Sequence, residues 1–92
     1  MSLIMSEIEV ARAKVLENVL AERERQDSIW GDQKDNTDDT WALIALEELG
    51  EVAKDINETK LGSAYTEIIQ VAAVMVAWAE SLRRRGVMKN YD

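Results

Sequence analysis

The segment EELGEVAKD carries several carboxylates at the spacing of one helix face. At about 100° per residue, Glu48, Glu51 and Asp55 fall on a narrow strip and Glu47 lies just beside it, whereas a leucine strip lies on the far side. An amphipathic helix with a solvated acidic face would account for this pattern. Trp41 shares the acidic strip, however, so that face is not purely polar.

The later segment AYTEIIQVAAVMVAWAE contains two polar residues in a run that is otherwise apolar. Glu67 and Gln70 lie three residues apart, and they share their helix face with Val71, Val74 and Trp78. Exposure to solvent therefore does not explain them. A buried lone carboxylate is unfavourable unless it is paired with a cation or binds one.

Two interpretations of Glu67 follow from this environment. In the first, the two polar strips face each other and offer four oxygen ligands, an arrangement that suits Mg²⁺ completed by waters and substrate phosphates. A divalent cation would also relieve the repulsion between the carboxylates. In the second, Glu67 forms a buried ion pair, for example with Lys54 or with an arginine of a neighbouring subunit. Residue spacing alone leaves both interpretations open.

The composition limits which other chemistry is available. The chain contains no cysteine and no histidine, which excludes disulfides, thiolate metal sites and an imidazole base. Its net charge of -7 would repel a phosphate backbone, so we expect no nucleic-acid partner. No signal-peptide pattern opens the chain, and the apolar run over residues 68–79 is shorter than the roughly 18 residues that span a bilayer. We expect a cytoplasmic protein without membrane contact.

The absence of proline and the apolar spacing of three and four predict an all-α fold, as a single domain over residues 1–92. Residues 27–40, rich in aspartate and asparagine, predict a loop that runs into the start of the second helix. The predicted helices are three in number and cover residues 6–26, 38–58 and 63–85.

The ends of these helices carry recognisable signals. Ser6 and Glu9 form a capping box before the first helix. Gly62, with a positive φ, and Ser63, as an N-cap, are expected to form the turn before the third helix. Gly86 is expected to end the third helix, after three consecutive arginines near its negative dipole end.

The third helix is apolar nearly all the way round, which is typical of a buried helix. Two other helices of one short chain cannot enclose it. We therefore expect a helical bundle completed by homo-oligomerisation, with this helix at or near the centre. Gly50, in the middle of the second helix, suggests close backbone packing against a neighbour.

Two motifs together, EELGE at residues 47–51 and EIIQ at residues 67–70, resemble the E-E-x-x-E … E-x-x-D signature of the MazG-like, all-α nucleoside triphosphate pyrophosphohydrolases. The upstream ERERQDSIWG, at residues 22–31, is similar to the segment that precedes the signature in small phage- or prophage-type members. The resemblance covers about residues 22–82, and the pair of motifs is far more specific than either half.

The resemblance implies hydrolysis of a nucleoside triphosphate to the monophosphate and pyrophosphate, with Mg²⁺ held between two helices of an oligomeric bundle, either a dimer or a tetramer. It assigns Glu48, Glu51, Glu67 and Gln70 as metal ligands and Glu47 and Glu51 as catalytic residues. Glu47 would be an additional ligand, or the group that helps to orient and deprotonate the attacking water. Gln70 stands where the family has an aspartate. An amide oxygen can coordinate Mg²⁺ but brings no charge.

A triphosphate substrate also needs a site that recognises its base by stacking and amide hydrogen bonds, and Gln26 and Trp30 are the candidates. Alternatively, Trp30 anchors the loop on the bundle and Gln26 lies at a frayed helix end. A second functional class is a catalytically silent acidic oligomer that binds a nucleotide or a protein partner, and the replacement of the family aspartate by Gln70 leaves this class open. A purely structural bundle would leave Glu67 unexplained.

Overall fold

The computed structural model describes residues 6–31 and 36–91, which contain three α-helices and no strand. The helices are α1 (Glu7–Trp30), α2 (Asp38–Asn57) and α3 (Leu61–Arg84). The all-α prediction is confirmed. The predicted loop after the first helix is wrong at its start, because residues 27–30 belong to α1. Residues 32–35 of that loop lie outside the described residues.

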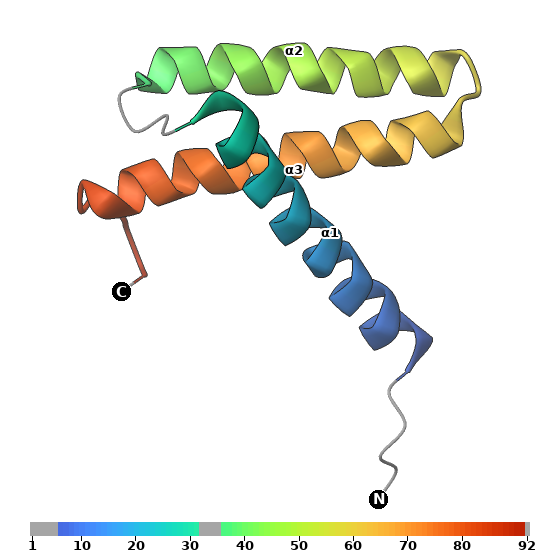
Figure 1. Cartoon of the computed structure of the whole chain (residues 1–92), viewed down its shortest axis with the longest axis horizontal. Helices are drawn as coiled ribbons and strands as arrows, with labels where there is room; N and C mark the ends of the chain where they lie inside the picture. The colour runs from blue at the N-terminus through green and yellow to red at the C-terminus, as the bar shows by residue number, and fades with distance from the viewer. Residues whose placement is uncertain (1–5, 32–35, 92) are drawn as a thin grey trace, which may run out of the picture.

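The helices form an antiparallel hairpin of α2 and α3 with α1 laid across it (Figure 1). Within the described residues α1 packs on α3 and makes no contact with α2. Helix α3 is therefore the shared central element, in agreement with its apolar sequence. The N-terminal half of α1 extends away from the hairpin (Figure 1), and every side chain from residue 7 to residue 18 is exposed.

The helix ends agree with the sequence signals in part. The Ser6 hydroxyl accepts from the amide of Glu9 at 3.1 Å and so caps α1. Gly86 follows α3 with a φ of 72°, a left-handed conformation that favours glycine. The predicted turn before α3 is wrong: Thr59 takes the positive φ of 57°, and α3 begins at Leu61 without a side-chain cap, so Gly62 is helical.

The core consists of two small clusters on either side of α3. Val19 of α1 packs with Ile69 and Ala73 of α3. On the other side, Trp41 of α2 packs with two residues of α3, Val74 and Ala77. The small side chains on α3 let both neighbouring helices approach it, but the buried volume remains limited.

Polar contacts close the hairpin where the start of α2 meets the end of α3. The Asp38 carboxylate accepts a hydrogen bond from the indole nitrogen of Trp78 at 2.9 Å. It also pairs with the Arg85 guanidinium at 2.7 Å. These contacts lower the pKa of Asp38, the hydrogen bond from Arg85 being the largest cause and the one from Trp78 the next.

Large apolar side chains remain exposed on both helices of the hairpin. We refer to two apolar strips, one on each helix. The α2 strip is Leu43, Leu46, Leu49 and Ile56, and the α3 strip is Leu61, Tyr65, Ile68, Met75 and Val76. By length and composition α3 is the one described helix that could cross a membrane, a criterion that the core helix of a soluble bundle also meets.

Gly50 does not have the close neighbour expected from the sequence. A Cβ atom at this position would meet no atom of the chain within 4 Å, and the residue is exposed. The prediction of close packing is therefore wrong within the single chain.

Candidate metal and substrate site

The acidic strip of α2 faces inward, toward α3, while the leucines face outward. Trp41 and Val52 are buried on this strip, and Glu48 and Asp55 on the same strip are half-buried. An amphipathic helix normally shows the reverse arrangement, with its apolar side turned to the core. The interpretation of a fully solvated acidic face therefore fails for this helix.

Glu67 of α3 meets this strip, and its carboxylate interacts with that of Glu48. Burial raises the pKa of Glu48 most, and the negative charge of Glu67 raises it further, followed by the charges of Glu51, Glu47 and Glu22. Three of the residues assigned as metal ligands, Glu48, Glu51 and Glu67, therefore lie close enough across the α2–α3 contact for their charges to interact.

The pKa of Glu67 is also raised, by burial first and then by the charges of Glu51 and Asp55. A hydrogen bond with Glu48 acts in the opposite direction and lowers it. The Oε2 atom of Glu67 is buried and has no hydrogen-bond partner within the described part of the chain. A buried carboxylate oxygen in this condition is unfavourable unless something else binds it.

The intrachain version of the ion-pair interpretation is not found. Among residues 6–31 and 36–91, neither lysine nor arginine forms a salt bridge with Glu67, and Lys54 is exposed. An arginine of a neighbouring subunit stays a separate prediction, because only one chain is present.

Gln70 lies one turn after Glu67 and is half-buried, and α1 contacts it through Gln26. The side-chain amide of Gln26 donates to the main-chain carbonyl of Gln70 at 3.4 Å and to the Glu22 carboxylate at 3.1 Å. Gln26 is itself only 3% exposed, so it is a packed contact between α1 and α3 and not a frayed helix end.

Glu22 is a member of this acidic group that the sequence did not single out. It lies one turn before Gln26 on α1 and is paired with the Arg25 guanidinium at 2.7 Å. This hydrogen bond is the largest cause of the lowered pKa of Glu22. Because Glu22 raises the pKa of Glu48, all three helices contribute charge to the same region.

The remaining predicted site residues lie at the edge of this region. Glu47 and Glu51 are exposed on α2. Trp30 is 45% exposed at the last position of α1, one turn after the buried Gln26. Trp30 and Gln26 are thus on the same helix. The Trp30 ring is partly exposed, whereas the Gln26 side chain is buried.

The acidic group offers oxygen donors that suit a divalent cation. Carboxylate oxygens are the donors that Mg²⁺ prefers, and the orphaned Oε2 of Glu67 is a ligand atom without a competing hydrogen bond. The described residues do not form a ready-made group of three or more acidic ligands around one point. The donor chemistry fits, and Mg²⁺ keeps several waters, so it does not require an all-protein cage.

Comparison with protein-family models, curated proteins and solved structures found no match to this chain.

Proposed function

We propose that the chain is a Mg²⁺-dependent nucleoside triphosphate pyrophosphohydrolase. It would cleave the bond between the α- and β-phosphates with one water, giving a nucleoside monophosphate and pyrophosphate. The observation that carries the proposal is the meeting of half-buried Glu48 and Glu67, with the exposed Glu51 beside them and a buried Glu67 oxygen that has no partner within the described residues. The two motifs that resemble the MazG-like family supply the reaction class.

Electrostatics support a requirement for a cation. A triphosphate carries several negative charges, and the chain has a net charge of -7 with several of its carboxylates close to Glu48. Without a counter-charge, substrate and site would repel each other. Bound Mg²⁺ would supply charge neutralisation of the phosphates and a polarised water.

Glu48, Glu51 and Glu67 would hold the cation, with the side-chain oxygen of Gln70 as a neutral fourth ligand. Glu47, exposed beside them, would orient the attacking water together with Glu51. Trp30 offers an exposed ring for stacking on the base. Gln26 would support the base-binding site from the buried side, because its amide is packed against α3 and donates to the Gln70 carbonyl.

The proposed enzyme is a homo-oligomer, either a dimer or a tetramer. The chain exposes 7161 Å², against about 5,400 Å² expected for a compact monomer of this mass. Its radius of gyration is 15.5 Å, against about 12 Å for a compact domain of this length. The excess surface includes the apolar strips of α2 and α3, so a second copy would cover what one chain leaves open.

The test is pyrophosphate release from a panel of ribo- and deoxynucleoside triphosphates, with and without Mg²⁺. We expect release from at least one triphosphate, only with Mg²⁺, and its loss in Glu48→Gln and Glu67→Gln. Glu24→Gln is the matched control, because Glu24 is exposed on α1 and its loss should leave activity unchanged. Nucleotide binding without release would instead identify the catalytically silent alternative, in which Gln70 has replaced the family aspartate.

A further inference from the structure

The outward face of α2 is apolar, and the chain does not cover it. Helix α2 forms one edge of the molecule, and among the described residues only α3 packs against it (Figure 1). Leu43 and Leu46 are each 66% exposed on the side turned away from α3, and Leu49 is 54% exposed. A contiguous apolar face of this kind is typical of a contact surface.

The residue spacing on this face is that of a coiled-coil seam. Leu43, Leu46, Gly50, Ala53 and Asn57 follow one another at intervals of three and four residues, and all five are exposed. Such spacing keeps one face of a helix turned toward a second helix. Because α3 packs on the opposite face of α2, the seam is open to a helix from another chain.

Gly50 lies at the centre of the seam and has no explanation within one chain. Glycine in the middle of a helix is unfavourable relative to alanine. A Cβ atom at this position would meet no atom within 4 Å, so no intrachain contact requires its absence. The close approach of a second helix would require it.

The order of side-chain sizes along the seam favours an antiparallel copy of α2. The large Leu43 and Leu46 precede Gly50, and the small Ala53 follows it. About a two-fold axis beside Gly50, Leu46 of one copy would lie over Ala53 of the other, so that the two helices approach evenly. A parallel copy would set leucine against leucine and glycine against glycine, which leaves an uneven gap.

The charges beside the seam favour the same arrangement. Glu47 and Lys54 lie two turns apart on the same side of the seam, and neither forms a salt bridge within residues 6–31 and 36–91. In the antiparallel pair each Glu47 would face Lys54 of the second copy. A parallel pair would instead set Glu47 against Glu47 and Lys54 against Lys54, which is repulsive.

We propose that two copies of this chain associate through an antiparallel α2–α2 contact with its two-fold axis beside Gly50. The inference rests on the oligomer in the proposed function and not on its chemistry. The chain exposes 7161 Å², about 1,700 Å² more than a compact monomer of this mass, and a standard interface covers roughly 800 Å² of each partner. The second copy would also bring its Lys54 beside Glu47 of the proposed site.

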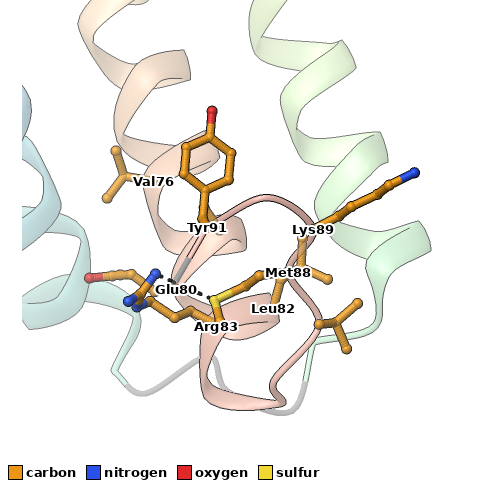
Figure 2. A pocket seen from close by; sticks show the side chains of 9 residues that line it. Val76, Glu80, Leu82, Arg83, Met88, Lys89 and Tyr91 are labelled. Carbon is orange, nitrogen blue, oxygen red and sulfur yellow. Dashed lines mark hydrogen bonds between the residues drawn. The ribbon is translucent and has the colours of Figure 1, made fainter.

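This contact is separate from the pocket of about 490 Å³ at the other end of α3 (Figure 2). The residues that line the pocket belong to the C-terminal half of α3 and to the tail. A contact through the outward face of α2 therefore leaves the pocket open.

Cysteine cross-linking tests the register, because the chain contains no cysteine of its own. Leu43→Cys and Asn57→Cys proteins, one of them labelled with ¹⁵N, are mixed and treated with a short bismaleimide. We expect cross-linked dimers that contain one copy of each variant. Neither variant alone should cross-link, because its two cysteines would lie about 21 Å apart along the helix axes.

Gly50→Leu separates the contact from a role within one chain. Leucine has the higher helix propensity and meets no atom of its own chain, so the isolated fold should be no less stable. Between two copies it would force the helices apart, and the dissociation constant should rise more than tenfold in analytical ultracentrifugation. Gly62→Leu is the matched control, because Gly62 is also helical with open space around it and lies outside α2.

Charge reversal tests the pairing of Glu47 with Lys54. Lys54→Glu should raise the dissociation constant roughly tenfold, because two exposed pairs are lost and each contributes up to about fivefold. The double variant Glu47→Lys/Lys54→Glu should restore wild-type association. Lys14→Glu makes the same change in net charge on the exposed part of α1 and should leave association unchanged.

Three outcomes would overturn the proposal. Cross-linking of each cysteine variant with itself would show a parallel pair, and an oligomer without cross-links in the mixture would place the contact elsewhere. A folded wild-type monomer at micromolar concentration would leave the α2 face to a different protein. Pyrophosphate release by that monomer would retain the proposed enzyme without the contact, whereas a cross-linked dimer without release would retain the contact alone.

Discussion

The carboxyl groups of Glu48 on α2 and Glu67 on α3 interact across the α2–α3 contact, and the charge of Glu67 raises the pKa of Glu48. Burial is the largest cause of the raised pKa of each of these two carboxyl groups. Two acids packed against each other destabilise the folded state when both are ionised. This relationship sets the expected response of the protein to pH and to cations.

The contribution of Glu48 and Glu67 to the free energy of unfolding should decrease as the pH rises. Both carboxyls have a pKa above the ordinary value of 4.5 in the folded state, so the folded protein binds their protons more tightly than the unfolded chain does. This contribution is fully present below about pH 4.5 and is lost as the pH rises through the raised pKa values. Glu67→Gln should flatten the dependence and leave stability at neutral pH unchanged or higher.

Denaturant unfolding without divalent cations, at fixed protein concentration and across this pH range, measures the effect. Glu24→Gln should retain the wild-type dependence, because Glu24 is exposed. A loss of roughly 3 to 5 kcal/mol at neutral pH in Glu67→Gln would contradict the expectation, since that is the effect of removing one partner of a buried ion pair.

Gln70→Asp should lower the melting temperature without metal and tighten Mg²⁺ binding. The substitution adds a carboxylate next to Glu67, and a charged oxygen is a stronger ligand for a hard cation than an amide oxygen. At a hundredfold excess over the dissociation constant, Mg²⁺ should stabilise the folded state by about 2.7 kcal/mol. Thermal unfolding over a Mg²⁺ titration gives both quantities.

Asn57→Asp makes the same amide-to-acid change at the end of α2 and should not alter the Mg²⁺ affinity. If Gln70→Asp and Asn57→Asp respond to Mg²⁺ identically, then Gln70 is not a ligand position.

Leu46→Glu should dissociate the proposed oligomer. Leu46 is 66% exposed on the α2 strip, so the change has little effect inside one chain but would place a charge in an apolar contact between copies. Light scattering at micromolar concentration measures the mass. Leu16→Glu is the matched control, because Leu16 is 61% exposed on the projecting half of α1. A folded wild-type monomer would refute the oligomer itself.

Gln26→Ala should destabilise the protein by about 1 to 3 kcal/mol, because it removes a buried amide and leaves the Gln70 carbonyl without that donor. Asn18→Ala is a suitable comparison: it removes the exposed 2.6 Å hydrogen bond between Tyr65 and Asn18 in the same α1–α3 contact. Its cost should be smaller. A Gln26→Ala protein with unchanged stability and an increased KM would show that Gln26 acts on substrate alone.

The existence and order of the helices could be predicted from sequence because apolar periodicity and caps are local properties. Their ends were less predictable. Residues 27–30 look like a loop by composition, yet α1 continues to Trp30, because the backbone turns only at Gly31, with a φ of 71°. At the start of α3, Thr59 takes the left-handed conformation although Gly62 is the better residue for it.

The arrangement of the candidate site could likewise be predicted from sequence only in part. The meeting of Glu48 with Glu67 was one of the two interpretations that helical spacing and the cost of burying an isolated carboxylate left open. The approach of Glu22 could not be predicted in this way, because it depends on where α1 crosses α3, at the contact of Val19 with Ile69 and Ala73. The burial of Gln26 could not be predicted from its local sequence either, because it depends on the contact between α1 and α3.

The projecting half of α1 implies a gradient of local stability within one continuous helix. The side chains of residues 7–18 are exposed, and contacts to α3 begin with the Asn18–Tyr65 hydrogen bond and the buried Val19. A segment of about twelve residues without tertiary support is marginal as a helix in water. Its amides should exchange with deuterium far faster than those of residues 19–30, so α1 would melt from its N-terminus while its C-terminal half stayed docked.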